Sequence, residues 1–153
     1  MSLKAGWLLI LILALGGAVA FNTLMPQGIG LLPPEVSRPL WQPASLRMAL
    51  KLHEQGAQFV DARDPGVYKL EHVRGAVNLY PQELELIYPL LRDQLKQASQ
   101  VVVYGRSRSR FPAATVAQFL RRQGLERVWV FEGDLGQWQK AGGPVRSRRR
   151  SPS

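Results

Sequence analysis

The most concentrated cationic segment in the middle of the chain carries an arginine at every second position. It comprises Gly105, Arg106, Ser107, Arg108, Ser109 and Arg110. Where such a loop runs into the start of a helix, successive backbone N–H groups and the helix dipole favour an anion. We therefore identify it as a candidate site for an oxyanion or an acidic partner side chain. The alternative is a solvated loop whose charges repel one another.

The chain has no cysteine and only two histidines among its 153 residues. The lack of cysteine excludes disulfides, zinc–thiolate sites, iron–sulfur clusters and every mechanism that uses a thiolate or a persulfide. With His53 and His72 as the only imidazoles, a histidine-based metal cluster is not expected either. We expect neither a metal nor another cofactor.

The remaining polar residues favour structural roles over catalytic ones. A triad of Ser107, His72 and Asp61 can be written down, but the chain has no nucleophile-elbow motif to present the serine. Asp61 and Arg63 follow an apolar stretch, and we expect them to brace the loops at a strand end. His53 falls on the apolar face of a predicted helix, which favours a place in the core.

The elements that must position these residues alternate between helix and strand. Strands are predicted at 58–61, 76–79, 101–104 and 128–131, and the last two are apolar without alternation, as strands buried on both faces are. Helices are predicted from Ser45 to the stop at Gly56, and over 81–96, 109–123 and 135–141, with Pro89 expected to interrupt the second.

This order predicts an α/β fold with a parallel sheet that helices flank on both faces. We expect the strands 101–104 and 128–131 at or near its centre. The carboxyl ends of parallel strands meet at one edge, so Arg63, the loop 105–110 and the segment 132–134 should lie close together.

Two stretches resemble the rhodanese family. Residues 59–79, FVDARDPGVYKLEHVRGAVNL, match its first signature at Asp61, Arg63, His72, Val73, Gly75, Ala76 and Asn78, with Glu71 where glycine is usual. Residues 101–145 resemble the second half, ending at Glu132, Gly133, Trp138, Gly142, Pro144 and Val145. The resemblance covers residues 44 to 145 and implies a rhodanese-like sheet, a structural role for His72 and a core position for Trp138.

The resemblance also implies a lost active site. Active members carry a cysteine where the strand opens a six-residue loop, and its thiolate takes up sulfur as a persulfide. Here Gly105 stands at that position, and Arg110 matches the loop arginine of the family. Arg108 replaces a residue that is commonly glycine. Without the thiolate there is no nucleophile for sulfur transfer or for a cysteine-dependent phosphatase.

The first part of the chain has a different composition. Residues 5–25 are uncharged over a length that spans a bilayer, and Lys4 precedes them, which predicts a transmembrane helix with its N-terminus in the cytoplasm and the domain on the opposite, periplasmic side. The alternative is a signal peptide that is cleaved after Ala20. Residues 26–43 form a proline-rich spacer with four residues that are too apolar for a free linker, Leu31, Leu32, Leu40 and Trp41. We expect them to rest on the membrane surface, the domain or a partner.

The expected boundaries are therefore 5–25, 26–43, 44–145 and a basic, disordered tail at 146–153. The formal charge is +9, and four arginines of the tail contribute 4 of these charges. The rest of the chain has only a mild positive excess, so net charge does not indicate a nucleic-acid partner. Membrane lipid and a membrane protein complex are the expected partners. We expect a membrane-anchored, catalytically inactive interaction module or accessory subunit. The alternative is an enzyme that reuses the cleft for chemistry without a thiol.

Overall fold

The computed structural model describes residues 3–24, 39–106 and 111–148. The chain divides into two units, Met1–Arg38 and Pro39–Ser153. In the first unit, α1 (Leu3–Leu24) leaves large apolar side chains exposed, among them Leu11 and Leu15. In the described part of the chain, no helix meets the length and apolarity that a membrane crossing requires. This finding does not support the membrane span predicted at 5–25.

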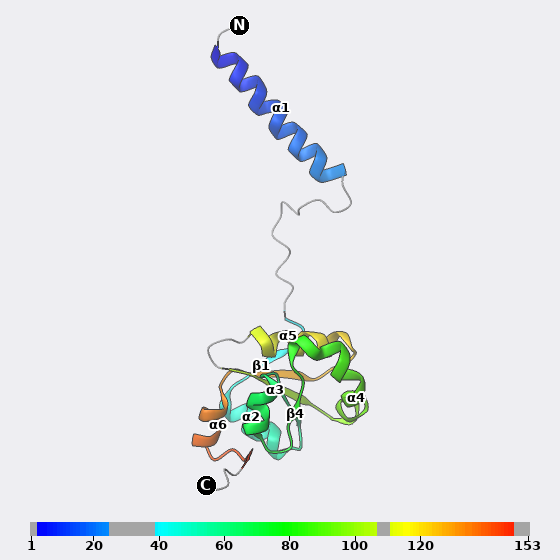
Figure 1. Ribbon diagram of the computed structural model, residues 1–153, viewed down its shortest axis with the longest axis vertical. Helices are drawn as coiled ribbons and strands as arrows, with labels where there is room; N and C mark the ends of the chain where they lie inside the picture. Colours follow the sequence, from blue (N-terminus) through cyan, green and yellow to red (C-terminus); the bar gives the residue numbers. More distant parts are fainter. Residues whose placement is uncertain (1–2, 25–38, 107–110, 149–153) are drawn as a thin grey trace. The chain divides into compact units, whose positions relative to one another are not determined.

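A five-stranded parallel sheet forms the centre of the second unit (Figure 1). Its spatial order is β1 (Gln42–Ala44), β6 (Val128–Phe131), β5 (Val101–Tyr104), β2 (Gln58–Asp61) and β4 (Val77–Asn78). The central strand β5 pairs with both neighbours, and its Val103 lies between Val60 of β2 and Val130 of β6. The predicted parallel sheet, with these two strands at and beside its centre, is confirmed.

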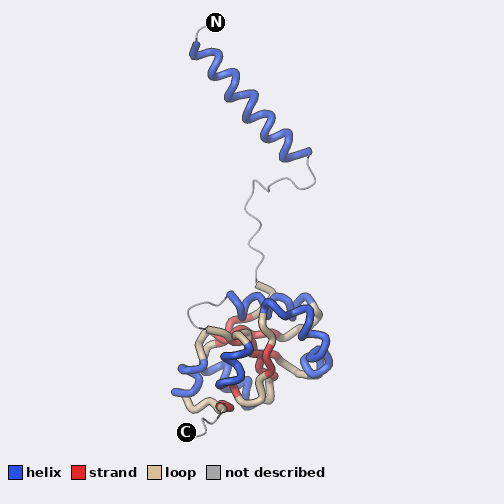
Figure 2. Tube along the Cα trace, viewed as in Figure 1, coloured by secondary structure: helices blue, strands red, loops and turns tan. Residues whose placement is uncertain are grey.

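Helices cover both faces of this sheet (Figure 2). They are α2 (Leu46–Glu54), α3 (Pro65–Leu70), the 3-10 helix η1 (Pro81–Glu83), α4 (Leu84–Gln97), α5 (Phe111–Arg122) and α6 (Leu135–Lys140). Alternate residues of β5 belong to opposite cores. Val101 and Val103 pack with α4 and α5, whereas Val102 and Tyr104 pack with α2 and α6. Burial on both faces explains why this strand is continuously apolar.

The first turn of α2 and the interior of α4 show how local sequence affects two of the helices. Ser45 caps α2, and its Oγ accepts a hydrogen bond from the Met48 N–H at 3.3 Å. The expected interruption at Pro89 is wrong, because Pro89 lies inside α4 and does not divide it. Proline removes the N–H that would bond the carbonyl of Glu85, and both residues are exposed, so water can supply that donor.

The folded unit extends beyond both boundaries that the sequence predicts. β1 begins within the expected spacer and pairs in parallel with β6, and the neighbouring Trp41 packs against the core. At the other end, β7 (Val145–Ser147) pairs antiparallel with β3 (Glu71–Val73) in a second, two-stranded sheet. Arg146 is thus part of a strand and not of a disordered tail. Residues 26–38 and 149–153 lie outside the described residues.

Trp138 is fully buried, which confirms its expected core position. The turn after α6 is shaped around its ring. Gly142 has a φ of +81°, a conformation that favours glycine, and a side chain at Gly143 would collide with the indole. The Trp138 Nε1–H donates to the carbonyl of Pro144 at 3.1 Å. The ring therefore holds this turn in place, next to the start of β7.

Candidate functional site

The carboxyl ends of the parallel strands lie at one edge of the sheet, as the sequence predicts. β2 ends at Asp61 and β5 at Tyr104, and these residues are register partners. A cavity of about 330 Å³ opens there, which we call the strand-end cavity. Its walls include Arg63, Asp64, Tyr80, Pro81, Arg106 and Phe111. The structure thus brings two of the predicted site residues, Arg63 and Arg106, to one cavity.

Asp61 and Arg63 form a buried ion pair beneath this cavity. Arg63 Nη2 lies 2.6 Å from Asp61 Oδ2, and the two side chains are 10% and 0% exposed. Arg63 also donates from its backbone N–H and its Nε to Asp61, and from Nη2 to the carbonyl of Glu71. Burial lowers the pKa of Arg63, but the hydrogen bonds and charge of Asp61 outweigh it and raise the pKa. The expected bracing role is consistent with these contacts.

Tyr104 connects this pair to the second, antiparallel sheet. Its ring lies under the Arg63 guanidinium, 5.5 Å from centroid to Cζ, and its hydroxyl accepts a hydrogen bond from the Val73 N–H at 3.0 Å. Burial raises the pKa of Tyr104 well above its usual range, and the charge of Asp61 raises it further. The phenol is therefore neutral and acts as a structural contact at ordinary pH.

A raised tyrosine pKa predicts loss of stability in alkali. The unfolded chain ionises Tyr104 above pH about 10, while the folded chain keeps it neutral, so stability is complete below that pH and falls as the pH rises. We expect Tyr104→Phe to reduce this fall by up to about 1.4 kcal/mol per pH unit. Urea unfolding between pH 9 and 11 measures it, with pH 7 to 9 as the control range. Equal alkaline slopes for the two proteins would contradict the assignment.

Gly105 follows β5 and is buried. A Cβ atom built on it would lie 3.5 Å from the Cβ of Ala113 and 3.7 Å from its backbone nitrogen, which are ordinary contacts. Ala113 belongs to the first turn of α5. The backbone therefore has room for a side chain at this position. Ser107, Arg108, Ser109 and Arg110 lie outside the described residues, so the candidate anion loop and the serine of the triad stay predictions.

Both histidines make contacts of a structural kind. His72 stacks on Tyr68 at 4.0 Å, and its Nδ1 lies 2.7 Å from the Tyr68 carbonyl oxygen. His53 is half-buried with its ring against Phe59 and Trp138, as expected for a core histidine. In residues 3–24, 39–106 and 111–148, no three His, Cys, Asp or Glu side chains gather as a metal site would require.

Two features of the site were not predicted from the sequence. Tyr80 and Pro81 line the strand-end cavity, and Phe111, which also lines it, has 78% of its surface exposed. The sequence did carry one signal for this feature, a phenylalanine directly after a polar loop and at the first position of a helix. Its exposure depends on the packing of α5 and is not visible in the sequence.

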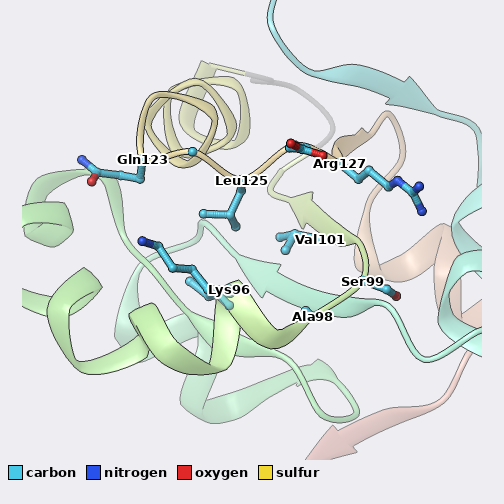
Figure 3. Close-up of a pocket in the computed structure, with 10 residues that line it drawn as sticks. Lys96, Ala98, Ser99, Val101, Gln123, Leu125 and Arg127 are labelled. Carbon is cyan, nitrogen blue, oxygen red and sulfur yellow. The ribbon is translucent and has the colours of Figure 1, made fainter.

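A larger cavity, of about 480 Å³, lies at the opposite end of the strands (Figure 3). Leu125 points into it, whereas Gln123 and Arg127 extend away toward opposite sides. Arg121, which does not line this cavity, donates hydrogen bonds to the carbonyls of Leu125 and Glu126. These two carbonyls are therefore already engaged within the protein. Because its polar groups do not converge, we favour the strand-end cavity as the candidate site.

Comparison with known proteins agrees with this arrangement. The sequence model of the rhodanese-like domain matches residues 45–141. Thiosulfate sulfurtransferase GlpE of Pseudomonas fluorescens is 33% identical over 91 residues, 60% of this chain and 78% of GlpE. GlpE of Vibrio cholerae is 28% identical over 94 residues, 61% of this chain and 83% of that protein.

A solved structure has the same fold. The rhodanese-like domain of the Alr3790 protein from Anabaena sp. superposes with a TM-score of 0.57 and 23% identity. The match covers 72% of this chain and 84% of that domain. At this identity the likeness supports the fold alone.

Proposed function

Because this chain belongs to the rhodanese-like domain family, we propose that it is a member that binds a partner and does not transfer sulfur. Relatives in the family are named thiosulfate sulfurtransferases. The observation that carries the proposal is the absence of cysteine from the 153 residues, with Gly105 at the end of the central strand. Neither serine nor histidine can replace the thiolate, because an alcohol or imidazole forms no persulfide.

The first test is sulfur transfer itself. The purified full chain is expected to form no thiocyanate from thiosulfate and cyanide above the rate without protein. An active member of the family, assayed in parallel, controls for the reagents. Turnover above the blank, retained after repeated purification, would contradict the proposal.

We propose that the bound group is an oxyanion or an acidic surface and that the segment 105–110 receives it. Arg106 lines the strand-end cavity, and two further arginines follow it in the sequence. An exposed contact of this kind depends on salt concentration.

Replacing Arg106, Arg108 and Arg110 together by alanine is expected to weaken partner binding at least about tenfold, the effect of losing about 1.4 kcal/mol. Co-purification from detergent extracts, quantified by mass spectrometry, measures the loss. Leu40→Ser is the matched control. It tests whether the partner instead contacts the segment before the domain, because Leu40 is half-exposed at the domain boundary. Undiminished binding by the triple variant, with loss in Leu40→Ser, would move the contact away from the arginine segment.

The alternative function is an enzyme that reuses the cleft without a thiol. It would use the polar groups near the cavity, but Arg63 is engaged by Asp61 and Asp64 Oδ1 accepts from the Gly66 N–H. Both groups thus have structural partners, which favours binding over catalysis. Turnover of any ester, phosphate or glycoside substrate that Arg106→Ala abolishes would favour the enzyme.

We also propose that α1 attaches the protein to a membrane, as an accessory subunit of a membrane complex. This part rests on the uncharged segment 5–25 and on the exposed apolar side chains of α1, which water solvates poorly. With the N-terminus in the cytoplasm, the domain lies on the periplasmic side of a bacterial membrane.

Fractionation tests the attachment. The full chain is expected in the pellet after carbonate extraction, and externally added protease should digest the domain in spheroplasts. A soluble protein whose new N-terminus is Phe21 would instead identify the segment as a cleaved signal peptide.

A further inference from the structure

We propose that the strand-end cavity binds a short acidic segment of a partner protein through one bulky apolar side chain. That side chain enters between Phe111 and Pro112 on one wall and Tyr80 and Pro81 on the other, and a carboxylate next to it pairs with Arg106. The inference rests on the proposed binding function and names the chemistry of the partner.

The walls of the cavity are suited to an apolar group. Phe111 and Pro112 start α5, and Tyr80 and Pro81 start η1, so rings from two elements line the same space. Phe111 is 78% exposed, an unfavourable position for a phenyl ring that nothing in the described residues covers. Burying a large apolar side chain against it would remove apolar surface of both partners from water. Aromatic residues and arginine are also the types enriched at the centres of protein interfaces.

The charge of the cavity selects the acidic neighbour. Arg63 is held by Asp61, and Asp64 caps α3 through its bond to the Gly66 N–H. Arg106 is exposed and has no ion-pair partner among the described residues. The guanidinium that remains for a ligand is therefore that of Arg106, and it attracts a carboxylate.

The same features disfavour a small inorganic oxyanion. Such an ion gains nothing from rings of Phe111 and Tyr80, and it needs several converging donors, whereas the described part of the lining offers one uncommitted guanidinium. A volume of about 330 Å³ is at the lower end of the range for ligand pockets, a size that suits a side chain. The combination of apolar walls and one cation at the rim fits a peptide.

The test uses the full chain in detergent and a fluorescein-labelled peptide in which phenylalanine stands between two aspartates. Fluorescence polarisation is expected to show saturable binding. Replacing the phenylalanine of the peptide by glycine, or both aspartates by lysine, should weaken binding at least about tenfold. Phe111→Ser and Arg106→Glu in the protein should do the same, and Arg106→Glu should bind the lysine peptide more tightly than the unchanged chain does.

Two matched controls lie outside the cavity lining, one on α4 and one on α5. Leu90→Ser removes an apolar side chain that is 79% exposed on α4, and Arg122→Glu reverses an exposed charge at the end of α5. Both should bind the peptide as the unchanged chain does. Circular dichroism confirms that each variant is folded, and amide shifts of Tyr80, Gln82 and Phe111 in the unchanged chain report the contact without any substitution.

Three results would overturn the inference: no binding of any peptide at millimolar concentration, binding that Phe111→Ser leaves unchanged, or thiosulfate binding at this cavity without peptide binding. In each case a partner that still co-purifies with the full chain would leave the proposed function standing. Sulfur transfer by the unchanged chain would contradict the proposed function while leaving the peptide result intact. The two failures are therefore distinguishable.

Discussion

Replacing Gly105 by cysteine is expected to give a protein that takes up one sulfur atom from thiosulfate, while the unchanged chain takes up none. The thiolate attacks the outer sulfur of thiosulfate, the S–S bond breaks, and sulfite leaves with the electron pair. Intact-mass measurement after incubation should show the addition of one sulfur atom, which cyanide then removes as thiocyanate. This is the largest change in activity that we expect from a single substitution.

Two features of the structure support this expectation. A Cβ atom at Gly105 meets Ala113 at an ordinary contact distance of 3.5 Å, so the new side chain begins without a collision. Ala113 is in the first turn of α5, and a helix N-terminus lowers the pKa of a nearby thiol. The end of the central strand is therefore a suitable place for a reactive cysteine. We expect sulfur transfer to be lacking because the thiol is missing, and not because the surrounding backbone is unsuitable.

Arg122→Cys is the control, because it places a thiol at an exposed position at the far end of the same helix. It should react with alkylating reagents but take up no sulfur from thiosulfate. A second variant combines Gly105→Cys with Arg108→Gly, which restores the residue that the family commonly has in the loop. If both Gly105→Cys variants are folded and neither takes up sulfur, the missing cysteine is not the only reason for the lack of sulfur transfer.

The sequence predicted the central strands well, because their residues are apolar on both faces. Val101–Tyr104 and Val128–Phe131 have the predicted bounds, and each runs through both cores. β1 and β7 were missed because each has three residues and forms only by pairing with a distant segment. Pro43 in β1 and Arg146 in β7 are also residues that favour a spacer and a tail. Such strands are determined by tertiary contacts and not by local preference.

The candidate site was predictable only where a motif places residues on strand ends. Asp61 ends β2 and Arg63 lies two residues later, so their pairing requires no more than the turn between them. The role of Tyr104 depends on which face of β5 its ring occupies and on where β3 lies, and neither is local information. Phe111 is similar, since its exposure follows from how α5 packs on the sheet. Motifs therefore indicate the position of the site, and packing determines its chemical character.

Asp61→Ala is expected to destabilise the folded domain by about 3–5 kcal/mol, the cost of leaving a buried charge without its partner. Arg63 would lose three donor contacts, from its backbone N–H, Nε and Nη2, while its guanidinium stays over the Tyr104 ring in a largely buried place. Urea unfolding at pH 7, followed by tryptophan fluorescence, measures the loss. The same substitution also removes the ion-pair partner of Arg63, which lines the strand-end cavity.

The chain offers a matched control and a way to separate the charge from the packing. Asp93 pairs with Arg92 on the exposed surface of α4, with side chains 81% and 57% exposed, so Asp93→Ala should cost less than about 1 kcal/mol. The double variant Asp61→Ala with Arg63→Met leaves no buried charge and should be more stable than Asp61→Ala alone, because the two effects are coupled. If the double variant is less stable than the single one, the Arg63 bond to the Glu71 carbonyl, and not the ion pair, is what stabilises this edge of the sheet.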